Sequence, residues 1–292
     1  MFQNNKMKQV CFFTAAGVLA LAAGFVFFMM GGENAGGTIE PGRALKIGIE
    51  CDFAPYNWEE KQPSATNQPL VNNKGFYAEG YDVQIALIVA KRMNAKVEFL
   101  KIPWGDMLVA LNDGRIDMVV SGMVDTEERK KLADFSNVYT PAPIEYTIMV
   151  RKDNKYAEGT MLVDFYNARM VGQKDSMMDA LIDQVYGVKH LPPVETIPDM
   201  FREVDRGNAD ALVINTEGIG PYMKEYPDLI PIKFAPGQGF RLGFNGICAA
   251  FRKEDTKLLR AFNKVLFGLS TEERTAVMEQ MTAKTEKADK EL

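Results

Sequence analysis

The sequence predicts an α/β protein of two similar lobes, because a strand motif is repeated, its copies are widely spaced and the chain is long. Residues 114–120 and 207–213 each begin with Gly, carry Asp in the fourth position and end in three apolar residues. The copies lie about one small domain apart, and 292 residues suffice for two hydrophobic cores. Ligands of open α/β sheets bind beyond the carboxyl ends of strands. Ser121, Gly122 and Asn215, which follow the motifs, are therefore predicted to face a cleft.

The other elements follow from local patterns along the chain. Apolar runs predict strands at residues 45–50, 97–102, 146–151 and 244–251. Helical spacing predicts two terminal helices, the second opened by a capping box of Ser270 and Glu273. The polar tail from Thr282 is predicted to fray.

Arg129 lies in the first turn of a helix predicted to begin at Thr126, where a cation is unfavourable beside the helix dipole. A positive charge next to unpaired loop N–H groups forms a binding site for a carboxylate. The alternative is that Arg129 pairs with Asp125 on a solvated face. The helix alone favours that pair, and the repeated motif shifts the interpretation towards a ligand site.

The N-terminus is typical of an export signal or a membrane anchor. Lys6 and Lys8 precede an uncharged run that is apolar over residues 10–30, about the length that spans a bilayer. Glu33 and Ala35 before Gly36 make a poor cleavage site, which favours an uncleaved anchor. Residues 33–43 are rich in Gly and predict a flexible tether. In either case we expect the body of the protein outside the cytoplasm.

The composition excludes several functions. The net charge of −5 and the lack of a basic cluster argue against a nucleic-acid partner. The body has one histidine and only Cys51 and Cys248, which leaves no zinc set and no catalytic triad. Buried free thiols are favoured over a disulfide between these cysteines. No nucleotide-binding loop is present either, so the sequence predicts binding rather than catalysis, without a metal or cofactor.

An ordered set of short segments resembles one known family, the extracytoplasmic solute-binding proteins of ABC importers for polar amino acids (type II fold, family 3). The similarity covers about residues 44 to 282. The segments are residues 45–49 (LKIGI), 80–83 (GYDV), 103–104 (PW), 114–117 (GRID), 121–123 (SGM), 126–129 (TEER) and 134–136 (DFS).

The resemblance implies an architecture and partners. It implies two α/β lobes that are joined by two hinge strands and close on a ligand. It also implies a monomer that delivers its ligand to a membrane permease and its ATPase. The expected division is a signal or anchor (1–32), a tether (33–43), lobe 1 (44–142 and 248–282), lobe 2 (143–247) and a polar tail (283–292).

The resemblance also implies roles for individual residues. Arg129 resembles the clamp for the ligand's α-carboxylate, and Trp104 and Phe53 resemble aromatic walls. Glu50 stands where the family often has an acid that reaches a cationic side chain. The expected ligand-binding residues are Glu50, Phe53, Trp104, Ser121, Gly122, Val124, Arg129, Ser176, Asn215 and Glu217.

Three departures from the family pattern affect the expected ligand. Val124 lacks the usual hydroxyl, and Ser176 retains one in an altered loop. Asn215 replaces the acid that holds the ligand's ammonium, and a buried ammonium without a carboxylate is costly. Either Glu217 or Glu50 substitutes for that acid, or the ligand is not an ordinary α-amino acid.

The expected function is binding of a polar amino acid or a close derivative for an ABC importer. The alternative is a periplasmic enzyme on the same fold that acts on a carboxylated ring such as prephenate, in the manner of cyclohexadienyl dehydratase. In that case Glu217 or Glu50 is the general acid.

Overall fold

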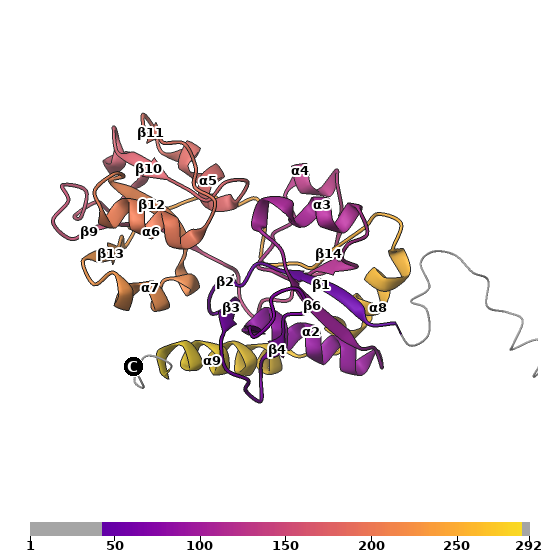
Figure 1. Ribbon diagram of the computed structural model, residues 1–292. Helices are drawn as coiled ribbons and strands as arrows, with labels where there is room; N and C mark the ends of the chain where they lie inside the picture. The colour runs from indigo at the N-terminus through magenta and orange to yellow at the C-terminus, as the bar shows by residue number, and fades with distance from the viewer. Residues whose placement is uncertain (1–42, 288–292) are drawn as a thin grey trace, which may run out of the picture.

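The computed structural model describes residues 43–287, which form two α/β lobes lying side by side (Figure 1). The predicted signal or anchor at residues 1–32 and the tether up to residue 42 lie outside the described residues. Arg43, assigned to the tether, instead belongs to lobe 1, where its guanidinium donates to both carboxylate oxygens of Asp117 at 2.8 and 2.9 Å. Within residues 43–287, no helix combines the length and apolar composition needed to cross a bilayer.

Each lobe contains a five-stranded sheet, and the two sheets have the same order of strand types. In both, three parallel strands are followed by two antiparallel neighbours. The strands of lobe 1 are, in spatial order, β6 (Val97–Lys101), β1 (Leu45–Ile49), β7 (Met118–Val119), β14 (Ala250–Phe251) and β8 (Asp134–Phe135). Those of lobe 2 are β11 (Lys189–His190), β10 (Arg169–Val171), β12 (Ala211–Asn215), β9 (Tyr146–Arg151) and β13 (Leu229–Pro231).

Helices cover the sheets, and apolar side chains at helical spacing attach them. In α6 (Ile197–Asp205), for example, Ile197, Met200, Phe201 and Val204 are buried on one face, and Thr196 caps the first turn. Lobe 1 also has α2 (Tyr81–Arg92), η1 (Trp104–Asp106), α3 (Met107–Asn112), α4 (Glu127–Lys130), α8 (Thr256–Phe267) and α9 (Thr271–Lys287). Lobe 2 also has η2 (Leu162–Phe165), α5 (Met177–Ala180), η3 (Leu181–Gln184), η4 (Thr216–Gly218) and α7 (Gly220–Glu225).

The repeated motif makes the same contacts in both lobes. The carboxylate of Asp117 accepts a hydrogen bond from the backbone N–H of Lys46 at 2.8 Å, and that of Asp210 accepts one from Arg169 at 2.9 Å. Gly114 and Gly207, which open the motifs, have φ values of 74° and 75°. The motif thus ties each helix-to-strand turn to the neighbouring parallel strand, and the prediction of two lobes built alike is confirmed.

The chain crosses between the lobes twice, at residues 136–145 and 232–249. These crossings are not strands, so the expected pair of hinge strands, and a strand over the whole of residues 244–251, are corrected. Two backbone hydrogen bonds of 2.9 Å, from Ser136 to Ala249 and from Tyr139 to Ile247, join the crossings instead. Two backbone hydrogen bonds are too few to make the crossings a regular β-ladder.

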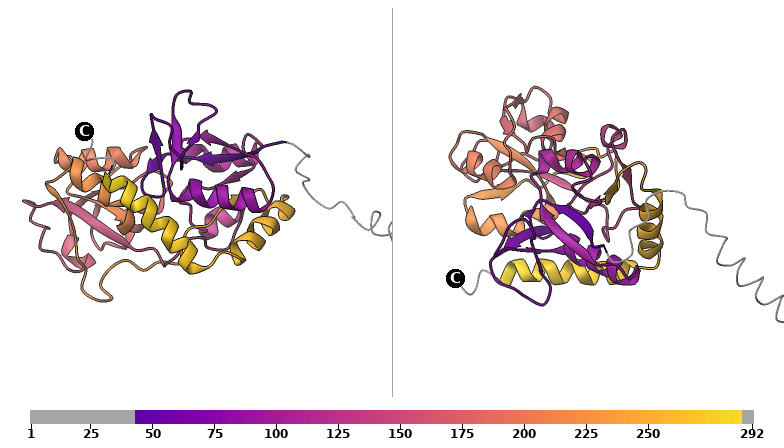
Figure 2. Two further views of the ribbon diagram at one scale, coloured as in Figure 1. Left: turned by 90° about the horizontal axis from the view of Figure 1, so that it is seen from below. Right: turned by 45° about the vertical axis from the view of Figure 1, so that its right-hand side comes forward.

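The last helix touches both lobes. Helix α9 packs against α2 of lobe 1 and α7 of lobe 2, and crosses the underside of the molecule in the left view of Figure 2. Its N-terminus has the predicted capping box, with Ser270 and Glu273 bonded reciprocally at 2.8 and 3.1 Å. The tail is predicted to fray from Thr282, but α9 continues through Lys287, the last described residue, so the prediction is wrong for residues 282–287.

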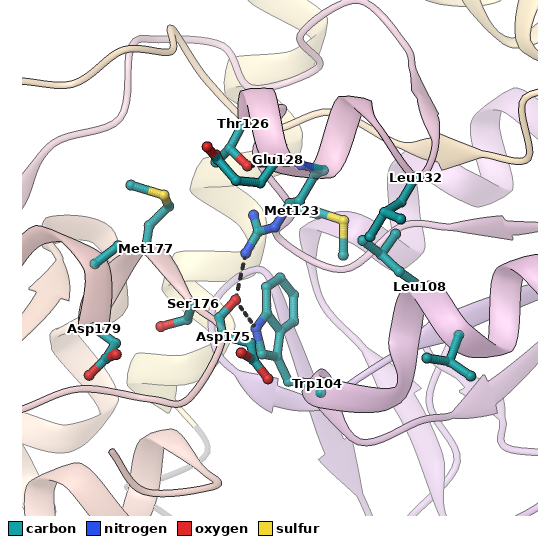
Figure 3. A pocket seen from close by; sticks show the side chains of 14 residues that line it. Trp104, Leu108, Met123, Thr126, Glu128, Leu132, Asp175, Ser176, Met177 and Asp179 are labelled. Carbon is teal, nitrogen blue, oxygen red and sulfur yellow. Dashed lines mark hydrogen bonds between the residues drawn. The ribbon is translucent and has the colours of Figure 1, made fainter. Parts of the chain in front are cut away.

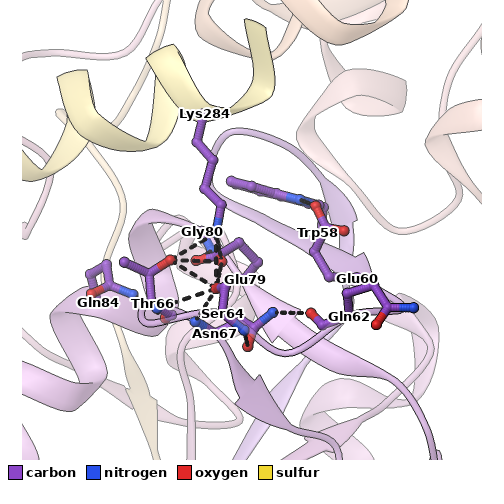
Figure 4. Close-up of polar contacts among 10 residues, drawn as sticks. All are labelled: Trp58, Glu60, Gln62, Ser64, Thr66, Asn67, Glu79, Gly80, Gln84 and Lys284. Atoms are coloured by element: carbon purple, nitrogen blue, oxygen red, sulfur yellow. Dashed lines mark hydrogen bonds and ion pairs between the residues drawn. The ribbon is translucent and has the colours of Figure 1, made fainter. Parts of the chain in front are cut away.

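A partly buried ion pair holds the end of α9 to lobe 1. The ammonium of Lys284 contacts the carboxylate of Glu79, whose side chain is fully buried (Figure 4). The hydroxyls of Ser64 and Thr66 donate to the same carboxylate at 3.0 and 2.8 Å. They lie near the small sheet of β2 (Asp52–Phe53), β3 (Asn57–Glu60), β5 (Tyr77–Glu79) and β4 (Gln68–Pro69).

Candidate functional site

A small cavity lies between the lobes, at the carboxyl ends of β1 and β10. Its volume is about 20 Å³, which is room for about one water molecule. Most of the predicted site residues line it: Glu50, Phe53, Trp104, Gly122, Val124, Arg129 and Ser176.

Arg129 reaches from α4 towards the opposite lobe. Its guanidinium donates to the carbonyl oxygens of Val124 at 3.0 Å and Asp175 at 2.9 Å, and lies 5.0 Å from the centre of the Trp104 ring. No carboxylate pairs with it among the described residues. Burial lowers the pKa of the guanidinium.

The alternative that Arg129 pairs with Asp125 is wrong. Asp125 is paired with Lys130 at 3.0 Å. Thr126 caps the helix and accepts the backbone N–H of Arg129, while the guanidinium of Arg129 donates to the carbonyls of Val124 and Asp175 and not to Asp125. The cation therefore faces the cleft without a counter-ion of its own.

The carbonyl of Asp175 bridges Trp104 and Arg129, two residues that line both the small cavity and a larger outer cavity. It accepts hydrogen bonds from both Trp104 Nε1, at 3.1 Å, and Arg129 (Figure 3). Asp175 itself has a left-handed backbone conformation, with a φ of 58°. Beyond the bridge lies an outer cavity of about 520 Å³ with a largely apolar wall that includes Leu108, Leu132 and Met177.

Glu50 is buried at the end of β1. Its backbone N–H donates to Ser121 Oγ at 2.9 Å, so this hydroxyl orders lobe 1 and does not line the small cavity. Gln173 donates to the Glu50 carboxyl at 2.5 Å. Burial, reinforced by Asp52 nearby, raises the pKa of Glu50 to about 8. The carboxyl is therefore largely protonated at neutral pH.

A second face of Glu50 opens on an acidic cavity of about 370 Å³. Asp52 and Glu195 also line it, together with Lys101. Lys101 is shared between Asp52 at 3.7 Å and Glu59 at 3.1 Å. Because the acids of this cavity outnumber its one cation, Lys101, the cavity has an excess of negative charge that suits a positively charged or amide group.

Gly122 allows close packing of Phe53 at the cleft. Gly122 has a φ of 62°, and a Cβ there would lie 2.8 Å from the Phe53 ring. A Cβ on Gly218 of lobe 2 would also lie 2.8 Å from this ring. Phe53 thus fits between glycines from opposite lobes.

Asn215 and Glu217 do not line the small cavity. Asn215 ends β12 and caps η4, its Oδ1 accepting the N–H groups of Glu217 at 3.0 Å and Gly218 at 3.3 Å. Its Nδ2 is buried without a hydrogen-bond partner. Burial raises the pKa of the Glu217 carboxyl.

Sequence reasoning did not identify several residues that line the small cavity. Gln173 follows β10 as Glu50 follows β1, so the strand-end rule could have found it. Nothing in the local pattern distinguishes the others from core residues: Tyr146, Met177, Met178 and Ile197.

No group of histidine, cysteine and acidic side chains in the part of the chain that the structure describes could hold a metal ion. Cys51 and Cys248 are buried free thiols, as predicted.

Comparison with known proteins points to one family. The profile of the bacterial extracellular solute-binding proteins, family 3, matches residues 45–281. A probable histidine-binding protein of Neisseria gonorrhoeae is 27% identical, with 90% of each chain covered. The arginine-binding extracellular protein ArtP of Bacillus subtilis is 29% identical, over 85% of this chain and 90% of its own. Among solved structures, a P235GK mutant of ArgBP from T. maritima matches with a TM-score of 0.67 and 26% identity, covering 82% of this chain and 95% of that one.

Proposed function

Because this chain belongs to the bacterial extracellular solute-binding proteins of family 3, we propose that it is the ligand-binding component of an ABC importer. It binds an amino acid or a close derivative between its lobes and presents it to a membrane permease and ATPase. The protein works outside the cytoplasm, and its N-terminal segment attaches it to the membrane or exports it.

The observation that carries this proposal is the guanidinium of Arg129 at the cleft. It is partly buried and has no acid partner among residues 43–287, and its present acceptors are two backbone carbonyls. A buried cation without a counter-ion is unfavourable, and a carboxylate makes the stronger, charge-assisted hydrogen bonds. The ligand's carboxylate therefore replaces the Asp175 carbonyl as a partner of Arg129.

The ligand's side chain is directed towards Glu50 and the acidic cavity. A cationic or amide group there finds an acceptor in Glu50 and further acids behind it. Relatives named for histidine and arginine accord with such a side chain.

Binding requires the lobes to move. The small cavity, at about 20 Å³, is far too small for an amino acid. Because the two crossings are irregular and share only short pairing, rotation about them separates the lobes. The ligand enters the open form and the lobes close on it.

Thermal-shift screening against amino acids and their derivatives tests the proposal, since a ligand of the native state raises the unfolding temperature. Titration calorimetry with the best ligand then compares Arg129→Ala with Arg115→Ala, an exposed arginine of the same lobe. Loss of the clamp leaves a carboxylate unpaired, which costs about 3 kcal/mol, roughly a hundredfold in affinity. Arg115→Ala should bind like the wild type.

Two results would contradict the proposal. One is a screen in which no amino acid or derivative stabilises the protein. The other is tight ligand binding by the Arg129→Ala variant, because that result would show that Arg129 does not hold the ligand's carboxylate.

A second candidate function is a lyase reaction on a carboxylated ring. The observation that favours it is the raised pKa of two carboxyls, Glu50 and Glu217, because a general acid must be protonated near neutral pH. Incubation with prephenate, followed by ultraviolet absorbance, distinguishes the two functions. Formation of an aromatic product that Glu50→Gln or Glu217→Gln abolishes would establish the lyase.

A further inference from the structure

The amide of Asn215 has a fixed orientation. Its Oδ1 accepts two backbone N–H groups, from Glu217 at 3.0 Å and Gly218 at 3.3 Å. Turning the amide over would place its NH₂ group against these donors and lose both bonds. The side-chain atom that takes no part in the cap is therefore Nδ2, which is a hydrogen-bond donor.

This donor is buried and unused. Asn215 is 1% exposed, and Nδ2 makes no hydrogen bond of ordinary geometry among the described residues. The Tyr56 hydroxyl and the Glu217 carboxyl are its polar neighbours, since burial raises the pKa of each group and Asn215 partly offsets that rise. Capping η4 explains Oδ1 but not Nδ2, because an aspartate or serine could cap the same turn. An unsatisfied buried donor costs about 1–3 kcal/mol, so it requires an explanation.

The strand pairing places Asn215 beside the cleft. Asn215 lies opposite Tyr146 in the antiparallel pair of β12 and β9, and residues opposite each other have their side chains on the same face. Tyr146 lines the small cavity and lies close enough to Arg129 to affect its pKa. Gly218, in the turn that Asn215 caps, packs on Phe53 of the opposite lobe.

We propose that Asn215 Nδ2 donates a hydrogen bond to the ligand, on an acceptor atom next to the carboxylate that Arg129 holds. The inference rests on the proposed function and narrows its ligand class. The ligand is a carboxylic acid whose α-substituent has lone pairs, such as a carbonyl, and is not a zwitterionic amino acid. An ammonium has three donors and no acceptor, so it would face Nδ2 donor to donor.

Titration calorimetry with matched ligand pairs tests this inference. The probes are L-arginine, L-glutamine and L-methionine, each paired with its α-keto acid. The variant Asn215→Asp keeps an oxygen for the cap and replaces the donor by an acceptor. Asn215→Asp combined with Glu217→Gln removes the neighbouring acid, so that the new carboxylate is ionised. Asn208→Asp, at an exposed position of lobe 2, adds the same charge away from the cleft.

The wild type and Asn208→Asp should prefer the keto acid of a pair roughly tenfold or more, since buried polar groups discriminate strongly against mismatched partners. Asn215→Asp, alone or in the double variant, should reverse this preference. If Asn215→Asp does not fold by circular dichroism, the ranking by the wild type decides.

The inference is overturned if the wild type prefers the amino acid. If Arg129→Ala then loses that amino acid, the proposed function stands without the inference. The inference is also overturned if Asn215→Asp folds and keeps the wild-type ranking. Failure of the wild type to bind any member of any pair would count against the proposed function itself.

Discussion

Gln173 of lobe 2 donates a hydrogen bond of 2.5 Å to the carboxyl of Glu50 in lobe 1. Both residues are buried and both follow a strand at the cleft. The amide of Gln173 also donates to the carbonyl of Glu195 in its own lobe at 3.2 Å, which holds it in position. The lobes are thus joined by their own polar groups where the ligand is proposed to bind.

We expect Gln173→Ala to favour the open form. The substitution removes a hydrogen bond that joins the two lobes in the closed form. Because the open form does not have this bond, its loss shifts the equilibrium towards the open form. Small-angle X-ray scattering without ligand should give a larger radius of gyration than for the wild type. Gln184→Ala is the control, because Gln184 bonds only within lobe 2, to Arg241. Equal radii for all three proteins would contradict this role of Gln173.

Glu50 should make the protein less stable as the pH rises. Its pKa is about 8 in the folded state against an ordinary value of 4.5. The folded state therefore holds the proton more tightly, and this stabilisation, complete below about pH 4.5, is lost as the pH rises through about 8. Urea titrations across this range measure the free energy of unfolding.

Glu50→Gln keeps the shape and cannot ionise, so its unfolding free energy should fall less over the same range. Glu254→Gln, at an exposed position, should keep the wild-type slope. A Glu50→Gln slope equal to that of the wild type would show that Glu50 titrates normally.

Gly122→Ala should weaken both folding and ligand binding. Its positive φ disfavours alanine, and the added Cβ meets Phe53 at 2.8 Å. Gly114 has a similar φ of 74° with nothing within 4 Å of an added Cβ, so Gly114→Ala measures the backbone cost alone, about 1 kcal/mol. Denaturant midpoints and calorimetry should therefore show a larger loss of stability for Gly122→Ala, and a loss of affinity in that variant only. Equal losses of stability and of affinity in the two variants would show that the contact between the added Cβ and Phe53 has no effect.

Lys284→Ala should destabilise lobe 1, because Lys284 is the cation that pairs with Glu79 of that lobe. The substitution leaves the buried Glu79 carboxylate with two hydroxyl donors, the backbone N–H of Gly80 and no cation. The expected cost is roughly 1–3 kcal/mol, visible in the urea midpoint. Lys264→Ala, exposed on α8, should have almost no effect. A midpoint unchanged by Lys284→Ala would show that the pair contributes nothing.

Sequence patterns predicted the regular parts of this fold well. The strand expected at residues 146–151 matches β9, because continuous apolar residues mark a buried strand. The repeated motif predicted two lobes because its Asp makes the same backbone contact in each. The crossings were mispredicted because their conformation depends on contacts between distant segments, which local propensity does not record.

The candidate site was only partly predictable. Strand ends and the resemblance to a family indicated Arg129 and Glu50, which do line the small cavity. The bond between Gln173 and Glu50 joins residues far apart in the sequence, and no spacing rule reaches that distance. The orientation of the Asn215 amide depends on two backbone N–H groups, so it appears only in three dimensions.

The ion pair between Lys284 and Glu79 also determines where the chain can be shortened. A fragment ending at residue 281, the last residue matched by the family profile, keeps every cleft residue and loses this lysine. Glu79, which is buried in the intact protein at the end of β5 in the small sheet that also contains Phe53, would then lack its counter-charge. The shortest stable fragment is therefore expected to extend beyond the family boundary, through at least Lys284.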